Sequence, residues 1–283
     1  MFNMARLDTR KRGIVDVDEL RAKRVAYGRP LGMSDYIRYS VTPGLLFGGL
    51  SFLIYYNGWV SAIILILGSV YGFMSYLPRT IRKEYERQGF AQRNKFLNNM
   101  TQVLTDEKQT VVMGLRKVIP RAGGEFKDVD LTRFHAQLLD ADIPRIRQAV
   151  DALIDKYEDD IIFVQYMEQL ETALIEGKTN IDTLKDIKSY HNDIRKKQDH
   201  YERQKLAHLK DMKKMMVVML ILIVSLTLSF GFDTYLSSVA RHPVGYVSGG
   251  VFIGLMFFFY TQFSRYLFDD SVLEMRTSTK VKG

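Results

Sequence analysis

Two long apolar blocks interrupt a chain that is otherwise rich in charged residues. Residues 39–78 hold no charged side chain, and residues 215–263 hold only Asp233 and Arg241. A soluble globule mixes charges with core residues along the chain, so this segregation predicts an integral membrane protein. Runs such as MMVVMLILIVSLTLSFGF have no polar face to turn toward water. This argues against the alternative of two helical hairpins buried in a soluble core.

Each apolar block has the length of two short membrane spans. A bilayer core needs roughly 20 helical residues. The turn signal Asn57-Gly58, followed by Trp59, divides the first block, and the polar connection 233–243 divides the second. We therefore expect two transmembrane helical hairpins, with spans at about 39–56 and 60–77, and at about 215–232 and 244–263.

Lysine and arginine residues are concentrated on one side of these expected spans. The two connections between paired spans hold one of them, whereas residues 1–38 hold nine, 79–95 six, 195–214 eight and 264–283 four. The positive-inside rule then places both termini and the middle segment in the cytoplasm. The expected organisation, in chain order, is a basic cytoplasmic N-terminal segment (1–38), transmembrane hairpin 1 (39–77), a cytoplasmic helical bundle (78–214), transmembrane hairpin 2 (215–263) and a cytoplasmic tail (264–283).

The middle segment has the periodicity of amphipathic helices. Apolar residues recur three or four positions apart, as in Phe96, Leu97, Met100, Val103 and Leu104, and strand-like alternation is limited to short stretches. Thr105–Gln109 separates two such helices, and Pro120–Gly124 predicts a loop. From Ile181 to Phe230 there is no Gly or Pro, so we expect one helix that leaves the bundle and enters the membrane as the third span. The expected fold class is an all-α integral membrane protein.

Small residues four positions apart occur in every expected span. Such pairs allow helices to approach closely in lipid, although glycine is also simply common in membrane helices. The candidate packing residues are Gly44, Gly48, Gly68, Gly72, Ser225, Ser229, Gly245, Gly249, Gly250 and Gly254.

Negative charge is concentrated in the middle of the cytoplasmic segment. Residues 125–176 contain 13 acidic and five basic side chains, a net charge of −8. One interpretation is that acids are kept away from anionic lipid. The other is that they bind a basic cytosolic partner through Asp155, Glu158, Asp159 and Asp160.

The sequence gives no pattern typical of an enzyme, so we expect no catalytic, cofactor-binding or metal-binding residues. The chain has no Cys, which excludes disulfides and thiol nucleophiles. Gly177-Lys178-Thr179 matches the end of a phosphate-binding loop, but Thr172 stands where that motif needs a glycine. His200 and His208 lie two helical turns apart, and a solvated surface explains them better than a metal site does.

The order of these elements resembles the type II secretion F-domain family, the inner-membrane platform proteins of type II secretion, type IV pilus and tight-adherence pilus machines. The matching stretches are LPRTIRKEYERQGFAQRNKFLNNMTQVL at 77–104 and ALIEGKTNIDTLKDIKSYHNDIRKK at 173–197. The single bundle is most similar to the tight-adherence branch. The chain departs from the family pattern at 105–110, where the family usually has a small, Gly-bearing turn, and in its extension at 1–35.

The resemblance implies a platform subunit in the plasma (inner) membrane that is not an enzyme and needs no cofactor. Its implied partners are a cytosolic secretion or pilus ATPase, a prepilin or pilin, and a second platform subunit or another copy of itself, with membrane lipid around it. The alternatives are a small transporter or channel subunit, or a membrane-anchored component of a conjugation apparatus. Nucleic acid is not expected as a partner, because residues 1–38 also contain five acids and few aromatic residues for base stacking.

Overall fold

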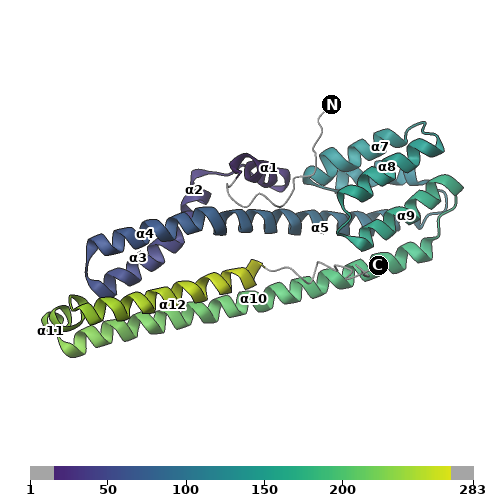
Figure 1. The fold of residues 1–283 in the computed structure, drawn as a ribbon. Helices are drawn as coiled ribbons and strands as arrows, with labels where there is room; N and C mark the ends of the chain where they lie inside the picture. Colours follow the sequence, from purple (N-terminus) through teal and green to yellow (C-terminus); the bar gives the residue numbers. More distant parts are fainter. Residues whose placement is uncertain (1–15, 269–283) are drawn as a thin grey trace, which may run out of the picture. The chain divides into compact units, whose positions relative to one another are not determined.

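The computed structural model describes residues 16–268, and these residues form helices without any strand (Figure 1). The prediction of an all-α chain is therefore confirmed for the described residues. The expected cytoplasmic tail lies outside them beyond Phe268, as does the N-terminal segment before Asp16. The chain divides into two compact units, which are described separately below.

Four helices of the described part are long and apolar enough to cross a membrane. They are Met33–Tyr55, Gly58–Leu104, Ile181–Phe230 and Pro243–Phe268. Each includes all or nearly all of one expected span, and two of them extend well beyond the length that a bilayer requires.

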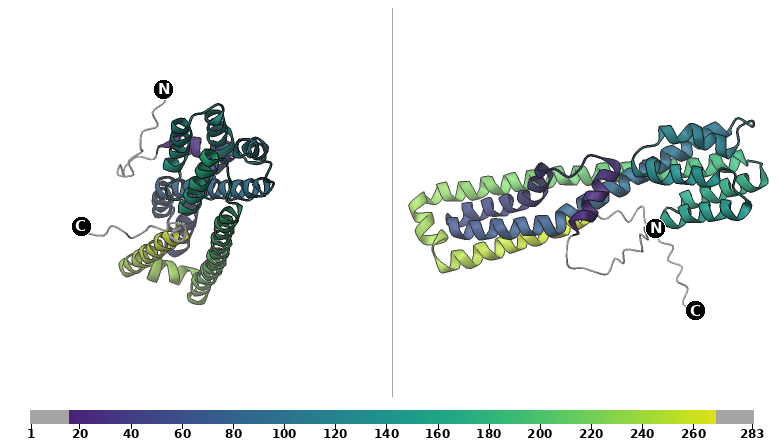
Figure 2. Two further views of the ribbon diagram at one scale, coloured as in Figure 1. Left: turned by 90° about the vertical axis from the view of Figure 1, so that its right-hand side faces the viewer. Right: turned by 90° about the horizontal axis from the view of Figure 1, so that it is seen from above.

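Unit 1 contains residues 16–25, Arg29–Lys83 and Asp211–Phe268. Its helical elements are most of α1 (Val17–Tyr27), α2 (Met33–Tyr36), the π-helical η1 (Ile37–Val41), α3 (Thr42–Tyr55), α4 (Gly58–Tyr71), η2 (Gly72–Tyr76), the start of α5 (Leu77–Leu104), the end of α10 (Ile181–Phe230), α11 (Phe232–Tyr235), η5 (Leu236–Ala240) and α12 (Pro243–Phe268). Figure 2 shows these helices from two further sides.

The break in the first apolar block lies one residue before the expected turn. Tyr56 ends α3 in the left-handed conformation (φ 46°), and Asn57 caps α4 by accepting hydrogen bonds from the backbone N–H groups of Trp59 and Val60 at 3.0 and 3.4 Å. Gly58 is therefore the first residue of α4 and not part of a turn. An Asn at this cap satisfies N–H groups that a helix start leaves without partners.

A proline and an expected polar connection both lie in helical segments of the structure. Pro78 lies inside one continuous helical run, where the π-helical turn Gly72–Tyr76 precedes it. A proline ring would clash with the carbonyl four residues earlier in a regular α-helix, and the wider π turn accommodates it. The expected polar connection 233–243 is mostly α11 and η5, and Gly231 (φ 75°) separates it from α10.

Unit 2 contains residues 26–28 and 84–210. Its helices are the remainder of α5, α6 (Val111–Val118), the short η3 (Ile119–Arg121) and η4 (Phe126–Leu131), α7 (Thr132–Leu138), α8 (Ile143–Lys156), α9 (Ile161–Glu176) and the first part of α10. The expected gap after Leu104 and the expected helix end at Gly177 are confirmed, and α10 spans the 50 residues predicted for it. Asn180 accepts a hydrogen bond from the backbone N–H of Thr183 at 3.3 Å, so it caps the start of α10.

An apolar core holds the helices of unit 2 together. Its fully buried members come from α5 to α10 and include Phe96, Leu97, Leu115, Phe126, Val150, Phe163, Tyr166 and Leu170. At about 25 cal/mol per Å² of apolar surface removed from water, a core of this kind is the main stabilising term of a soluble bundle.

The predicted loop Pro120–Gly124 packs against Ala26 and Tyr27, which belong to the N-terminal segment of unit 2. Its first two residues belong to η3, and Gly124 adopts φ 61°. A Cβ at Gly124 would lie 2.5 Å from the carbonyl oxygen of Ala26 and would also meet the ring of Tyr27. Only glycine fits this backbone conformation and this close approach.

Candidate functional site

The turn between α8 and α9 carries most of the predicted partner-binding residues. Asp155, Glu158 and Asp159 are exposed, as is Asp151 one turn earlier on α8. No carboxylate of these four forms an ion pair with another described residue. We call Asp151, Asp155, Glu158 and Asp159 the acidic surface.

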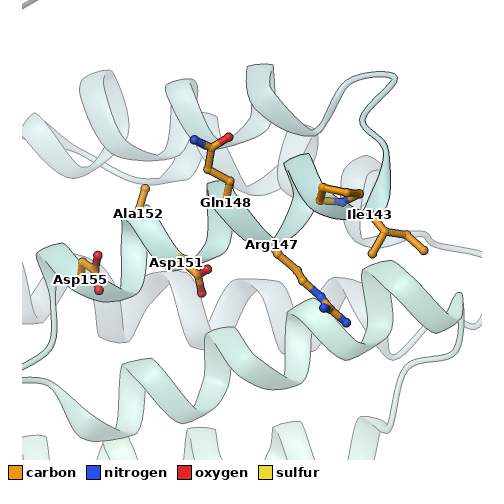
Figure 3. A pocket seen from close by; sticks show the side chains of 7 residues that line it. Ile143, Arg147, Gln148, Asp151, Ala152 and Asp155 are labelled. Carbon is orange, nitrogen blue, oxygen red and sulfur yellow. The ribbon is translucent and has the colours of Figure 1, made fainter.

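An open groove lies along the outer face of α8 and includes part of the acidic surface (Figure 3). Its volume is about 520 Å³, and its lining includes Ile143, Pro144, Arg147, Gln148, Asp151 and Asp155. Ile143 is 50% exposed, and Arg147 forms an ion pair of 3.6 Å with Glu171 of α9. The groove therefore combines an apolar end with a carboxylate end.

Asp160 does not belong to this surface, which corrects its predicted role. Its side chain is 8% exposed and accepts a hydrogen bond from Arg93 Nε at 2.7 Å, while His191 Nε2 lies 3.5 Å away. The carboxylate also caps α9 by accepting from the Phe163 N–H at 3.2 Å. Burial alone would raise the pKa of Asp160, but the His191 hydrogen bond and the Arg93 guanidinium outweigh it and hold this pKa below its ordinary value.

A second group of acids is also bound internally. Lys156 Nζ lies 2.7 Å from a carboxylate oxygen of both Glu125 and Asp130, and the Tyr157 hydroxyl donates to Asp130 at 2.5 Å. Burial, followed by the nearby Asp130 carboxylate, raises the pKa of Tyr157 strongly. At least three of the 13 acids in residues 125–176 therefore stabilise unit 2 and are not available to a partner.

The sequence did not predict a network of buried and partly buried polar side chains between α5 and α10. We call this network the seam; its members are Asn94, Asn98, His191, Asn192 and Arg195. Asn98 and Asn192 exchange two amide hydrogen bonds of 2.9 Å, and Asn94 Nδ2 lies 2.8 Å from His191 Nδ1 and 2.9 Å from Asn192 Oδ1. Arg195 Nη1 donates to Asn94 Oδ1 at 2.8 Å. The four-residue spacing of Asn94 and Asn98 in α5 is the one sequence signal of this seam.

The predicted small residues fall into two groups. Gly44, Gly48, Gly68 and Gly72 lie where α3 and η1 meet α4 and η2, and a Cβ at Gly68 would be 2.8 Å from Gly44 Cα. A Cβ at Gly249 would be 2.9 Å from Ile54 Cγ2, so this glycine permits close packing of α12 on α3. These five residues therefore lie at close helix approaches within unit 1.

The other predicted packing residues do not lie in such contacts within the described chain. Ser225 and Ser229 are exposed on α10, where Ile223 and Thr227 are the buried positions instead. The nearest atoms to a Cβ at Gly245 belong to Val239 of the preceding turn, Gly250 has ordinary contact distances, and Gly254 has no described heavy atom within 4 Å. Identical spacing in the sequence therefore does not specify which face of a helix is covered.

The described residues contain no group of three or more His, Asp or Glu side chains that could hold a metal ion. The Gly177-Lys178-Thr179 sequence lies in the connection between two helices, where Gly177 ends α9 with φ 68°. A phosphate-binding loop follows a strand and opens a helix directly, and this segment lacks that context.

Comparison with known proteins gives the chain a relative over nearly its whole length. A Bacillus anthracis protein described as uncharacterized protein pXO2-23 is 46% identical over 268 residues, which are 95% of this chain and 96% of that protein. The chain belongs to the family of this protein. The match extends over the sequence of both units. No protein-family model matches the chain, and no solved structure matches it.

Proposed function

We propose that this chain is a multi-pass protein of the plasma membrane with both termini in the cytoplasm. In this proposal α3 and α4 form one membrane hairpin, the apolar part of α10 and α12 form the other, and unit 2 lies in the cytoplasm. The support is the length and apolarity of four helices together with the concentration of Lys and Arg beyond one end of each.

The chain would act, without catalysing a reaction, as a platform subunit of a pilus-assembly or type II-like secretion machine. It would couple a cytosolic motor ATPase to the handling of pilin in the membrane. One observation carries this proposal: α10 runs for 50 residues from the apolar core of unit 2 to the apolar helices of unit 1. A continuous helix of about 75 Å, at 1.5 Å per residue, suits a protein that passes position or force from a soluble bundle to a membrane span.

The acidic surface is the proposed contact for the motor. Its four carboxylates are exposed and are free of ion pairs with described residues. Charges facing each other across such a contact mainly set the encounter rate and the orientation, and each exposed pair adds only about 0–1 kcal/mol. A single neutralisation should therefore have little effect, whereas several reversed charges should act together.

The test is a triple variant, Asp155→Lys, Glu158→Lys and Asp159→Lys. It is assayed for copurification of the cytosolic motor ATPase of the same pilus or secretion machine. Asp160 is left unchanged because it stabilises unit 2. We expect copurification to fall most at low salt, where the charge repulsion is least screened, and the difference from the unchanged chain to shrink as salt is raised. Pilus or secretion output should fall with it.

The matched control reverses three other exposed acids of unit 2: Glu107→Lys, Asp128→Lys and Asp186→Lys. It makes the same change in net charge away from the acidic surface. Equal ATPase retention by both triple variants at low salt would show that the acidic surface is not the contact.

A further inference from the structure

Three helix ends of unit 1 meet at a group of cationic and aromatic side chains. The ring centroid of Tyr76 is 6.2 Å from that of Tyr39 and 5.3 Å from that of Phe268. Lys83 Nζ donates to the carbonyl oxygen of Leu267 at 3.0 Å. The segment before α3, the start of α5 and the end of α12 therefore lie side by side (Figure 2).

The helical register places Arg79 and Ser264 within this group. Arg79 is three residues after Tyr76 and four before Lys83, so all three share one face of the helix, and the two flanking residues both contact α12. On α12, Ser264 precedes Phe268 by four residues and shares its face. Arg38 adjoins Tyr39, and its Cζ lies 6.0 Å from the Tyr39 ring centroid.

Two of these polar groups lack a hydrogen-bond partner among the described residues, and two of the arginines lack a carboxylate. Arg79 Nη1 and Ser264 Oγ are buried without a hydrogen bond, and Ser264 is 2% exposed. Neither Arg38 nor Arg79 forms an ion pair with a described carboxylate. Arg79 as a whole is only partly buried, so its other N–H groups remain accessible to a ligand. A guanidinium group left without an anion is costly, and phosphate oxygens match its paired donors.

We propose that Arg38, Arg79 and Ser264 bind the phosphate group of an anionic phospholipid. This inference rests on the proposal that the apolar helices of unit 1 span a membrane with these ends at the cytoplasmic face. Tyr39 and Tyr76 then lie at the level where aromatic side chains meet headgroups. The cytoplasmic leaflet is also where anionic lipids attract cations. A free phosphate ion has the same oxygen atoms but no acyl chains to hold it at this depth.

The experiment measures retention of phosphatidylglycerol by the full chain in neutral detergent, using native mass spectrometry. We expect the double variant Arg38→Gln and Arg79→Gln to bind this lipid roughly tenfold more weakly than the unchanged chain. The control variant, Arg116→Gln and Lys178→Gln, removes two exposed cations of unit 2 that lie far along the chain from the expected spans, and it should retain the lipid like the unchanged chain. No loss in the first variant, or an equal loss in both, would overturn the site.

Three further measurements distinguish failure of the lipid site from failure of the proposed membrane embedding. Millimolar inorganic phosphate should not displace the lipid, and complete displacement would overturn the choice of a lipid ligand. Alkaline carbonate extraction tests membrane embedding by itself: an unchanged chain that leaves the membrane contradicts the proposed function, whereas an embedded chain without lipid preference contradicts only the site. If the double variant does not fold, Arg38→Gln alone decides, because Arg38 is exposed. Unchanged lipid retention in that variant would overturn the proposal.

Discussion

The two units satisfy their buried polar groups in different ways. In unit 2, Asn94, His191 and Asp160 are buried or nearly so, and each has hydrogen-bond partners within the same unit. The buried side-chain atoms without a partner among the described residues all belong to unit 1: Arg24 Nε, Tyr36 Oη, Ser40 Oγ, Ser51 Oγ, Ser69 Oγ, Tyr71 Oη, Arg79 Nη1 and Ser264 Oγ.

The units also differ in where their apolar surface lies. Unit 2 encloses its large apolar side chains in one core. In unit 1, only 12–33% of the most apolar 18-residue stretch of each of the four long helices is buried. Side chains such as Ile66, Leu67 and Val218 are more than half exposed. A surface of this kind is unstable in water and stable in lipid. Unit 2 therefore has the stabilising core of a soluble bundle, whereas unit 1 combines close backbone contacts with a largely exposed apolar surface.

The largest expected effect concerns the glycine contact of α3 with α4. Gly68→Leu would place a side chain where even a Cβ lies 2.8 Å from Gly44 Cα, so the two helices must separate. Overpacking by added methylenes typically costs about 1–3 kcal/mol, but a backbone contact has no flexible side chain that can move aside, so we expect a larger cost at this position. We expect loss of the monodisperse peak in detergent gel filtration.

The matched control is Gly254→Leu, because no described heavy atom lies within 4 Å of a Cβ at that position. It should elute like the unchanged chain. If both variants behave alike, close packing of α3 and α4 is not what holds unit 1 together.

The next effect concerns the buried ion pair of unit 2. Asp160→Asn leaves Arg93, whose side chain is 12% exposed, without its carboxylate, and breaking a buried pair in this way costs about 3–5 kcal/mol. We expect a lower free energy of unfolding for unit 2 at neutral pH, measured by following the circular dichroism of the full chain. If the unfolding midpoint of Asp160→Asn equals that of the unchanged chain, the ion pair between Arg93 and Asp160 does not stabilise unit 2.

Asp160 also makes the folding stability of unit 2 depend on pH. The folded pKa of Asp160 is lowered, so its contribution is present above the unfolded pKa of about 4 and is lost as pH falls through the folded value. The unchanged chain should therefore lose stability below about pH 4 more steeply than Asp160→Asn does. Parallel acid limbs would show that this carboxylate is not linked to folding.

The smallest effect concerns the amide pair of the seam. Asn98→Leu and Asn192→Leu together remove both members of the reciprocal pair, and replacing both partners of a hydrogen bond by apolar groups is often nearly neutral. The single variant Asn98→Leu leaves the Asn192 amide with fewer partners and should cost about 1–3 kcal/mol. A double variant that is less stable than the single one would contradict this balance.

The sequence predicted helices well where local signals act alone. The absence of Gly and Pro after Asn180 was enough to predict α10, and Gly177 was enough to end α9. It could not separate Asp160 from Asp159, because adjacent residues of one type differ only in which way the folded turn directs them. The seam was missed for a related reason: Asn94 and Asn192 read as ordinary surface residues until α5 and α10 are brought together.

The proposed function requires that unit 2, which carries the acidic surface, lies in the cytoplasm. It also requires that the two short connections between paired spans lie on the outer side of the membrane. The chain has no Cys, so single cysteines can report on this without background. Gly58→Cys, Ser238→Cys and Gln137→Cys each place one thiol at an exposed or open position. In intact cells a membrane-impermeant maleimide should label the first two and should label the third only after the membrane is broken. Labelling of Gln137→Cys in intact cells would contradict the account.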